Sequence, residues 1–396
     1  MGYVVSNEKF FAPIRDVVSM VKLKASYGLV GNDQIGGDRR FIYNETVIGG
    51  GKYYFGTTPS QYTSVRLGEF PNPNVGWEKA KKFNLGADLS FFNQLNISVD
   101  YFKENREGIF LQRKSIPMYV GLSTKPWVNI GKMRNSGIDA SLEYHQPLGK
   151  DLHLTVRGNF TYARNRIMDQ DEPDYAYTYM NHSGQMQWQK FGLVAAGLFQ
   201  DQEDIDSWAK QSFGEVKPGD IKYLDLNGDG IVDGNDVTTA GSPTVPEIQY
   251  GIGATVKWRR LDFSFMFQGA SNVSLRMYNM HPFCDASHFG YGITQYIADN
   301  HWSEDNNRAD AAYPRLTSQL SSNNTQSSTF YIHDAKYLRL KTVELGYTIK
   351  KLRVYLSGNN LFVISPFDYW DPEKGGGHGL SYPLQRTAKI GVQYQF

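Results

Sequence analysis

The feature that most constrains this 396-residue sequence is a repeated alternation of apolar and polar side chains. The segment LDFSFMFQ at 261–268 places a leucine and three phenylalanines on one face of an extended chain, and Asp262, Ser264 and Gln268 on the other. Successive side chains of a β-strand point to opposite faces, so this pattern predicts a strand with one apolar and one wet face. The same pattern returns in the segments 83–91, 96–102, 152–163 and 389–396.

The lengths of the connections narrow the fold class further. Short turns are predicted at 91–94, 146–151, 258–262 and 348–352, and they alternate with long polar connections at 112–131, 168–247, 271–332 and 365–385. A soluble sandwich would also show alternating faces. Short turns at one end and long loops at the other are typical of outer-membrane barrels, whose long loops face outside the cell. The sequence therefore predicts an all-β fold: an antiparallel transmembrane β-barrel portion of roughly ten strands.

Composition and motifs exclude several other classes. Aromatic residues make up 14% of the chain and glycines number 39, which suits many strands joined by turns. The formal net charge is +1 and no basic run occurs, so nucleic acid is not an expected partner. The sequence contains no HExxH, GxSxG, Walker A or GxGxxG motif, and we predict no enzymatic activity. The N-terminal residues do not resemble a signal peptide, so the chain is either cytoplasmic or a fragment.

The sharpest local motif is DLNGDGIVDGND at 225–236, inside the longest connection. Its spacing matches an EF-hand-like calcium loop, with Gly230 at the sharp turn and Val232 free to anchor the loop to its surroundings. The last ligand is an aspartate instead of the usual glutamate, which reduces bidentate reach. The alternative is a turn rich in Asp, Asn and Gly that holds no ion. We predict one structural Ca²⁺, held by side chains and one main-chain carbonyl from Asp225, Asn227, Asp229, Ile231, Asp233 and Asp236.

Two further groups of loop residues are candidates for binding. His281, His288 and His301 lie near Asp285 and Glu304 in one connection and suggest a metal cluster, although scattered loop histidines are more often solvated. Loop aromatics are candidates for stacking on sugar rings or peptide side chains, and the alternative for each is packing within its own loop or at the membrane interface. These aromatics are Tyr53, Tyr54, Phe55, Tyr175, Tyr177, Tyr179, Tyr369 and Trp370.

Several segments together resemble the SusC/RagA family of TonB-dependent transporters. The most specific is PGDIKYLDLNGDGIVDGND at 218–236, followed by GSPTVPEIQYGIGA at 241–254. The segments 21–32, 77–102, 129–144, 337–348 and 353–364, and the pieces around 371–387, resemble family segments in the same order. The resemblance implies part of an outer-membrane active importer for oligosaccharides or peptides in a Gram-negative bacterium. It also implies energisation by TonB and a SusD-like surface lipoprotein as partner.

The resemblance covers the C-terminal part of such a transporter. We expect residues 1–396 to be the C-terminal half of the barrel, with 225–236 in an extracellular loop, and the plug domain, signal peptide and TonB-binding segment to be missing from this chain. Barrels with a plugged lumen have about 22 strands, so about ten strands leave an edge unpaired. Outer-membrane lipid surrounds such a barrel and does not tolerate an exposed strand edge, which is why we expect a fragment of a longer protein. The alternatives are a passive outer-membrane porin or adhesin barrel and a soluble calcium-dependent β-protein.

Overall fold

The computed structural model describes residues 1–35, 39–122, 124–278, 295–317, 320–379 and 381–396. One antiparallel sheet dominates it, with eleven strands in the order β1-β2-β5-β6-β7-β8-β15-β16-β19-β20-β21. The strands are β1 (Gly2–Val4), β2 (Val18–Asn32), β5 (Glu78–Phe91), β6 (Leu95–Gln112), β7 (Trp127–Leu148), β8 (Leu152–Asp169), β15 (Ile248–Trp258), β16 (Leu261–Ser271), β19 (Tyr337–Ile349), β20 (Leu352–Ile364) and β21 (Thr387–Tyr394). Ten of them are long, and β1 is a three-residue strand at one edge, so the predicted strand number is confirmed.

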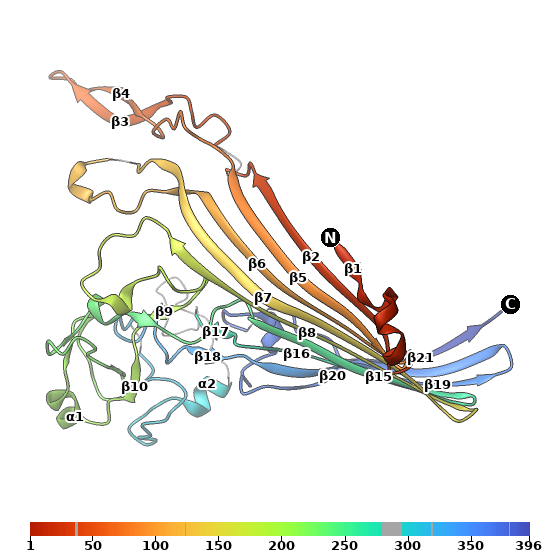
Figure 1. Cartoon of the computed structure of the whole chain (residues 1–396). Helices are drawn as coiled ribbons and strands as arrows, with labels where there is room; N and C mark the ends of the chain where they lie inside the picture. Colours follow the sequence, from red (N-terminus) through yellow and green to blue (C-terminus); the bar gives the residue numbers. More distant parts are fainter. Residues whose placement is uncertain (36–38, 123, 279–294, 318–319, 380) are drawn as a thin grey trace.

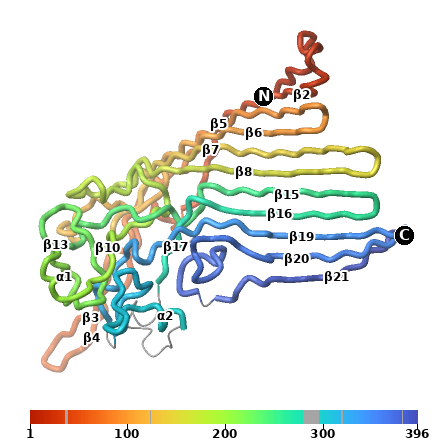
Figure 2. The backbone as a smooth tube through the Cα atoms, turned by 90° about the horizontal axis from the view of Figure 1, so that it is seen from below, coloured from red at the N-terminus to blue at the C-terminus, as the bar shows by residue number. Residues whose placement is uncertain are grey.

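Neighbours in the sheet are mostly neighbours in the sequence, which produces a row of hairpins (Figure 2). The four predicted short turns join β5 to β6, β7 to β8, β15 to β16 and β19 to β20. The turns after Trp258 and Ile349 contain two residues each, and their first residues, Arg259 and Lys350, have φ values of 53° and 55°. The strands form a curved sheet with the short turns at one end and the long connections at the other (Figure 1). Among the described residues, β1 and β21 are the two edges, so this sheet does not close on itself.

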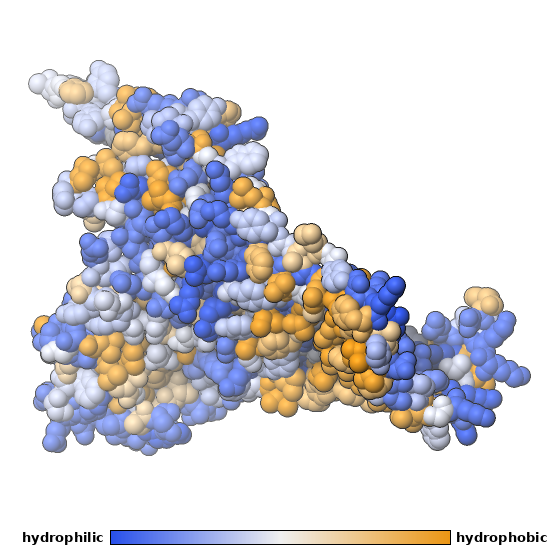
Figure 3. All heavy atoms as spheres, viewed as in Figure 1, coloured by the Kyte–Doolittle hydropathy of each residue, from blue (hydrophilic) through white to orange (hydrophobic). Residues whose placement is uncertain are grey.

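The strand register gives the sheet two different faces, because directly opposed residues of an antiparallel pair point the same way. One row of opposed residues, Leu85, Tyr101, Ile138 and Tyr162, is apolar. The adjoining row, Gly86, Asp100, Asp139 and Thr161, is small or polar. Leu85, Tyr101 and Ile138 are exposed although they are large and apolar. On the side drawn in Figure 3, apolar residues gather over the strand region.

A projecting hairpin was not predicted from the sequence. It lies in the connection between β2 and β5 and consists of β3 (Val47–Phe55) and β4 (Ser60–Leu67). It extends away from the sheet at the end that carries the long connections (Figure 1). Short 3-10 helices, η1 (Val5–Asn7) and η2 (Lys9–Ile14), connect β1 to β2. In the described residues, no helix is both long enough and apolar enough to cross a membrane.

Three long connections pack together into what we call the loop domain, formed by residues 170–247 and the described parts of 272–336 and 365–386. It contains η5 (Thr178–Met180), β9 (Phe191–Gly192), β10 (Ala195–Leu198), α1 (Gln202–Ser207), β11 (Lys210–Gln211), β12 (Ile221–Tyr223), β13 (Ile231–Val232), η6 (Gly234–Asp236), β14 (Thr238–Thr239), β17 (Ser274–Arg276), α2 (Gln295–Asn300), β18 (Ile332–Asp334) and η8 (Pro372–Lys374). A fourth connection, between β6 and β7, carries η4 (Met118–Val120).

The loop domain has a hydrophobic core of its own. Its members come from all three connections, and several, such as Ile221, Tyr223 and Val232, are completely buried. Burying a side chain of the size of valine or isoleucine contributes about 1.5–3 kcal/mol, so these loops hold a defined structure. The core consists of Leu193, Leu198, Ile221, Tyr223, Val232, Val273, Leu275, Met277, Ile297, Trp302, Ala311, Tyr313, Tyr331, Ala335 and Phe367.

Candidate functional site

The polar face of the sheet carries linked ion pairs. Lys24 on β2 reaches Asp88 at 2.7 Å and Asp100 at 3.0 Å, which lie on the next two strands. Arg353 on β20 lies between Asp262 and Glu344, with 2.6 Å to the Glu344 carboxylate. Charges that are paired across strands hold a wet surface in a fixed arrangement. This face therefore suits contact with water or polar ligands, whereas the opposite face suits lipid.

A buried polar junction joins two connections of the loop domain. Asp220 is completely buried and lies 2.7 Å from Nε of Arg315, whose Nη2 also donates to Asp220 at 3.1 Å. The amide of Asn324 donates at 2.8 Å to Oδ1 of Asp220, the same oxygen that lies 2.7 Å from Arg315 Nε. Burial raises the pKa of the nearby Tyr223, so this phenol stays neutral. A buried carboxylate needs such partners, and these fix residue 220 against 315–324.

The predicted calcium loop folds as a series of tight turns stabilised by its own side chains. Asp225 accepts hydrogen bonds from the backbone N–H groups of Gly228 at 2.7 Å and Gly230 at 2.8 Å. Asp236 is completely buried, and its carboxylate accepts from Leu226 at 2.7 Å and Asp233 at 2.8 Å. The first and last predicted ligands therefore close the loop from both ends.

The remaining predicted ligands lie between these two. Asn227 accepts from the Asp229 N–H at 3.0 Å, Asp229 from Ile231 at 2.8 Å, and Asp233 from Asn235 at 2.7 Å. Val232 is completely buried in the loop-domain core, so its anchoring role is confirmed. The backbone N–H of Lys210 on β11 donates to the Gly230 carbonyl at 3.0 Å, which fixes the middle of the loop to the same domain.

The donor set of this loop consists of hard oxygens, the ligands that Ca²⁺ takes. In the described part of the chain, no three or more His, Cys, Asp or Glu side chains converge as they would around a metal ion. A carboxylate oxygen that accepts one N–H keeps a second lone pair, so the hydrogen bonds of the loop are compatible with a cation. Calcium binding here stays a prediction.

The other candidates from the sequence are distributed differently. His281, Asp285 and His288 lie outside the described residues, and Nδ1 of His301 lies 2.7 Å from the Ala298 carbonyl. The side chains of Tyr53, Tyr54 and Phe55 are exposed on the projecting hairpin.

The loop aromatics near the calcium-type loop and in 365–386 are packed. Tyr179 stacks on Tyr177 and donates its hydroxyl to the Asn235 carbonyl at 2.7 Å, beside the calcium-type loop. Tyr369 packs edge to face on Tyr296 at 5.2 Å, and burial raises its pKa. Packing within the loops thus accounts for Tyr179 and Tyr369.

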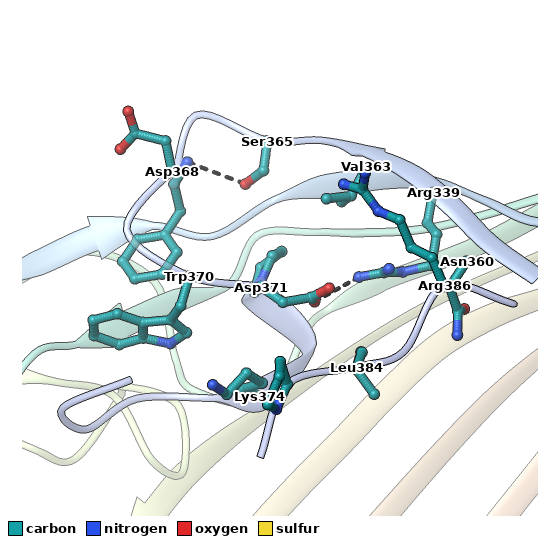
Figure 4. Close-up of a pocket in the computed structure, with 13 residues that line it drawn as sticks. Arg339, Asn360, Val363, Ser365, Asp368, Trp370, Asp371, Lys374, Leu384 and Arg386 are labelled. Atoms are coloured by element: carbon teal, nitrogen blue, oxygen red, sulfur yellow. Dashed lines mark hydrogen bonds and ion pairs between the residues drawn. The ribbon is translucent and has the colours of Figure 1, made fainter. Parts of the chain in front are cut away.

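A hollow at the foot of the connection 365–386 was not predicted from the sequence. It has a volume of about 430 Å³ and lies between the ends of β19 and β20 and the loop that follows them (Figure 4). Arg339, Asn360, Trp370 and Arg386 line it. Trp370 is one of the loop aromatics that the sequence suggests for binding, but the polar residues come from separate segments and share no sequence motif.

Comparison with known proteins identifies the family to which this architecture belongs. The family described as TonB dependent receptor-like, beta-barrel matches residues 23–361, most of the chain. The chain belongs to this family. Its sheet is therefore part of an antiparallel β-barrel in the outer membrane, with the exposed apolar face toward lipid and the polar face toward the lumen. The soluble alternative is excluded.

Individual TonB-dependent receptors show how much of such a protein the chain represents. It is 28% identical to TonB-dependent receptor P26 of Formosa agariphila, over 98% of this chain and 41% of that protein. It is 26% identical to TonB-dependent receptor SusC of Bacteroides thetaiotaomicron, over 100% of this chain and 39% of that protein. The fold is similar to a chain in the structure of the RagAB peptide importer in the open-open state, with a TM-score of 0.73, 22% identity, and coverage of 100% of this chain and 42% of that chain.

The chain thus spans about two fifths of the curated relatives it matches. Those relatives are named as receptors, which agrees with the expectation of a transport protein and not an enzyme.

Proposed function

We propose that this barrel portion works, within its complete parent protein, in active import of oligosaccharides or peptides across the outer membrane. The match to the TonB-dependent receptor family over residues 23–361 carries the proposal. Import in this proposal is energised by TonB through a part of the parent outside residues 1–396. The parent also works with a SusD-like surface lipoprotein, and the likeness of the fold to a RagAB chain supports a two-component importer.

The structure offers features that suit this role. The polar, ion-paired face supplies a hydrated wall for cargo, and the loop domain lies at the end of the sheet opposite the short turns (Figure 1). We further propose that the loop 225–236 binds one Ca²⁺ that orders this domain and takes no part in chemistry. The oxygen donors and the anchoring of Val232 support that proposal.

Transport in cells that express the complete parent tests the import function. Accumulation of a labelled cargo should require the parent, should disappear when TonB is deleted, and should stop when the proton gradient is dissipated. Accumulation that needs the parent but continues without TonB would support the passive porin alternative. A pull-down of the parent from detergent extracts should recover a SusD-like lipoprotein, and its absence would contradict the proposed partner.

A further inference from the structure

Three cationic side chains are found among the described residues that line the hollow beside the connection 365–386. Two of them are held by partners within the fold. Arg339 is almost completely buried and lies 2.5 Å from Asp371 and 3.0 Å from Glu373, and Lys374 donates to the carbonyls of Gly379 and Ser381.

The third cationic side chain is Arg386. It is exposed, and it forms no ion pair with a carboxylate in the described part of the chain. Figure 4 shows it beside Arg339 on one side of the hollow, with Trp370 on the other. A guanidinium without an ion-pair partner at the side of a hollow favours an anionic ligand group, because its planar set of donors matches a carboxylate.

The same hollow contains an acceptor without a donor. The side-chain oxygen of Asn360 is buried and has no hydrogen-bond partner among the described residues. Its amide nitrogen donates to the Gln385 carbonyl at 3.1 Å, which fixes the orientation of the side chain. A buried, unpaired acceptor is unfavourable, and a ligand hydroxyl or N–H satisfies it whereas a carboxylate does not. The hollow therefore suits a ligand that carries both an anionic group and hydrogen-bond donors.

Two further hollows lie on the polar face of the sheet. Tyr337 donates its hydroxyl to Glu373 at 2.9 Å, the carboxylate that also contacts Arg339, and Tyr337 lines the next hollow. That hollow and the one beyond it, each of about 360 Å³, share Asn159 and Gly251. Among the described residues that line them, the polar side chains are mainly neutral hydroxyls and amides, and Arg157 carries the charge. The neutral side chains include Thr155, Asn159, Thr161, Gln249, Ser264 and Gln268.

The space in these hollows depends on glycine. A Cβ on Gly251 would lie 2.7 Å from the Asn159 side-chain oxygen, and one on Gly253 would lie 2.7 Å from the Phe265 carbonyl. A path of hydroxyl and amide groups over backbone without side chains suits a chain of sugar rings, because each ring offers several hydroxyls as both donors and acceptors.

The geometry points to a cargo-selecting site for an acidic oligosaccharide, with Arg386 and Asn360 receiving a sugar unit that carries a carboxylate. This inference rests on the proposed import function and names its cargo class. Arg386 pairs with the carboxylate, Asn360 accepts from a ring hydroxyl, and Trp370 forms the apolar wall. The volume of about 430 Å³ lies in the range of small-molecule sites.

Binding to the purified complete parent in detergent tests this inference by titration calorimetry. The probes are trigalacturonate, its neutral carboxyl-reduced counterpart, and trialanine. Trigalacturonate should bind more tightly than the neutral trisaccharide. Arg386→Gln should weaken trigalacturonate binding about tenfold or more, as expected for a charged hydrogen-bonded pair, and should leave binding of the neutral trisaccharide unchanged. Arg386→Lys should retain most of the affinity, and Arg66→Gln, on the projecting hairpin, is the matched control.

Each other result overturns the inference. The site is refuted if the acidic and neutral trisaccharides bind equally, or if neither binds. It is also refuted if Arg386→Gln binds trigalacturonate with unchanged affinity. Tighter binding of trialanine, lost in Arg386→Gln, would assign the hollow to peptides. Uptake of cargo in cells distinguishes failure of this site from failure of the import function. If uptake depends on TonB but is the same in Arg386→Gln, the import function is supported and the site is refuted.

Discussion

Nε of Arg315 lies 2.7 Å from the carboxylate of Asp220, and the Asp220 side chain is completely buried. The two residues are far apart in the sequence and belong to different long connections. Arg315 also donates its backbone N–H to the carbonyl of Gly219 at 2.9 Å, so side chain and main chain fix the same contact. The loop domain is thus held by a specific polar junction as well as by its apolar core.

Removing the cation of this junction should loosen the loop domain. Arg315→Met leaves Asp220 buried without its ion pair, which costs about 3–5 kcal/mol in comparable sites. Hydrogen exchange in the complete parent should rise in residues 217–224 and 320–331, with the barrel strands unchanged. Arg308→Met removes an exposed arginine that pairs with the exposed Asp310 and should have no measurable effect. Equal exchange in both variants would show that the junction is not important for stability.

A methyl group at Gly219 should have a similar local effect by a different route. Gly219 has a φ of +85°, and a Cβ there would lie 2.1 Å from the Trp302 ring. Gly219→Ala therefore introduces both backbone strain and a clash, and should cost more than about 1 kcal/mol. Gly234→Ala is the control, because its φ is not in the left-handed region and no atom lies within 4 Å. The two variants are compared in the parent protein by heating it and measuring how sensitive the loops are to protease at each temperature.

The loop domain should lose stability in acid because of Glu172. Its carboxylate accepts from the Ser183 hydroxyl at 2.5 Å, the Gln170 amide at 2.9 Å and the His182 N–H at 2.8 Å. Burial raises the pKa of Glu172, but these hydrogen bonds outweigh burial and the pKa lies below its ordinary value. The stabilisation is fully present above the unfolded pKa of about 4.3 and is lost as the pH falls through the folded pKa.

Protease cleavage within 170–184 measures this loss. With a protease that is active in acid, cleavage of the parent in this segment should increase below about pH 4.3. The Glu172→Gln variant should be cleaved to a similar extent at every pH tested. The Glu203→Gln variant, changed in the first turn of α1, should behave like the unchanged protein. A transition of equal size in Glu172→Gln would assign the pH dependence to other groups.

The sequence predicted the sheet well because one physical rule controls it. Each barrel strand needs an apolar and a polar face, so residues such as Phe263 and Ser264 reveal the strand and its register. The projecting hairpin escaped prediction because the large residues Tyr53, Tyr54 and Phe55 are consecutive and all exposed, so they show no two-residue period.

The loop domain and the hollow could not be predicted in this way. Ile221, Leu275 and Phe367 meet in one core, yet they come from three connections with no periodic pattern. Arg386 and Asn360 line the same hollow only because β20 and the chain entering β21 lie side by side. The calcium-type loop was recognisable because its candidate ligands lie within twelve consecutive residues, whose spacing alone sets the local geometry.

Calcium should order the loop 225–236 and the segment around it. Four aspartates in one tight loop repel each other, and a cation removes that repulsion. Limited proteolysis of the complete parent should therefore give less cleavage within residues 200–245 in calcium than in chelator. Magnesium should protect poorly, because it requires a tighter octahedral shell and dehydrates reluctantly.

Variants separate ion binding from turn formation in this loop. Asp225→Ala with Asp229→Ala removes two proposed ligands together with acceptors for the N–H groups of Gly228, Gly230 and Ile231, so cleavage should be high under all conditions. Asp225→Asn with Asp229→Asn keeps an amide oxygen as acceptor but removes the charge, so cleavage should no longer depend on calcium. Asp174→Asn, outside the loop, should leave the calcium response intact. If cleavage of the unchanged protein is the same in calcium, magnesium and chelator, the hydrogen bonds of Asp225 and Asp236 are enough to form the loop, and it holds no ion.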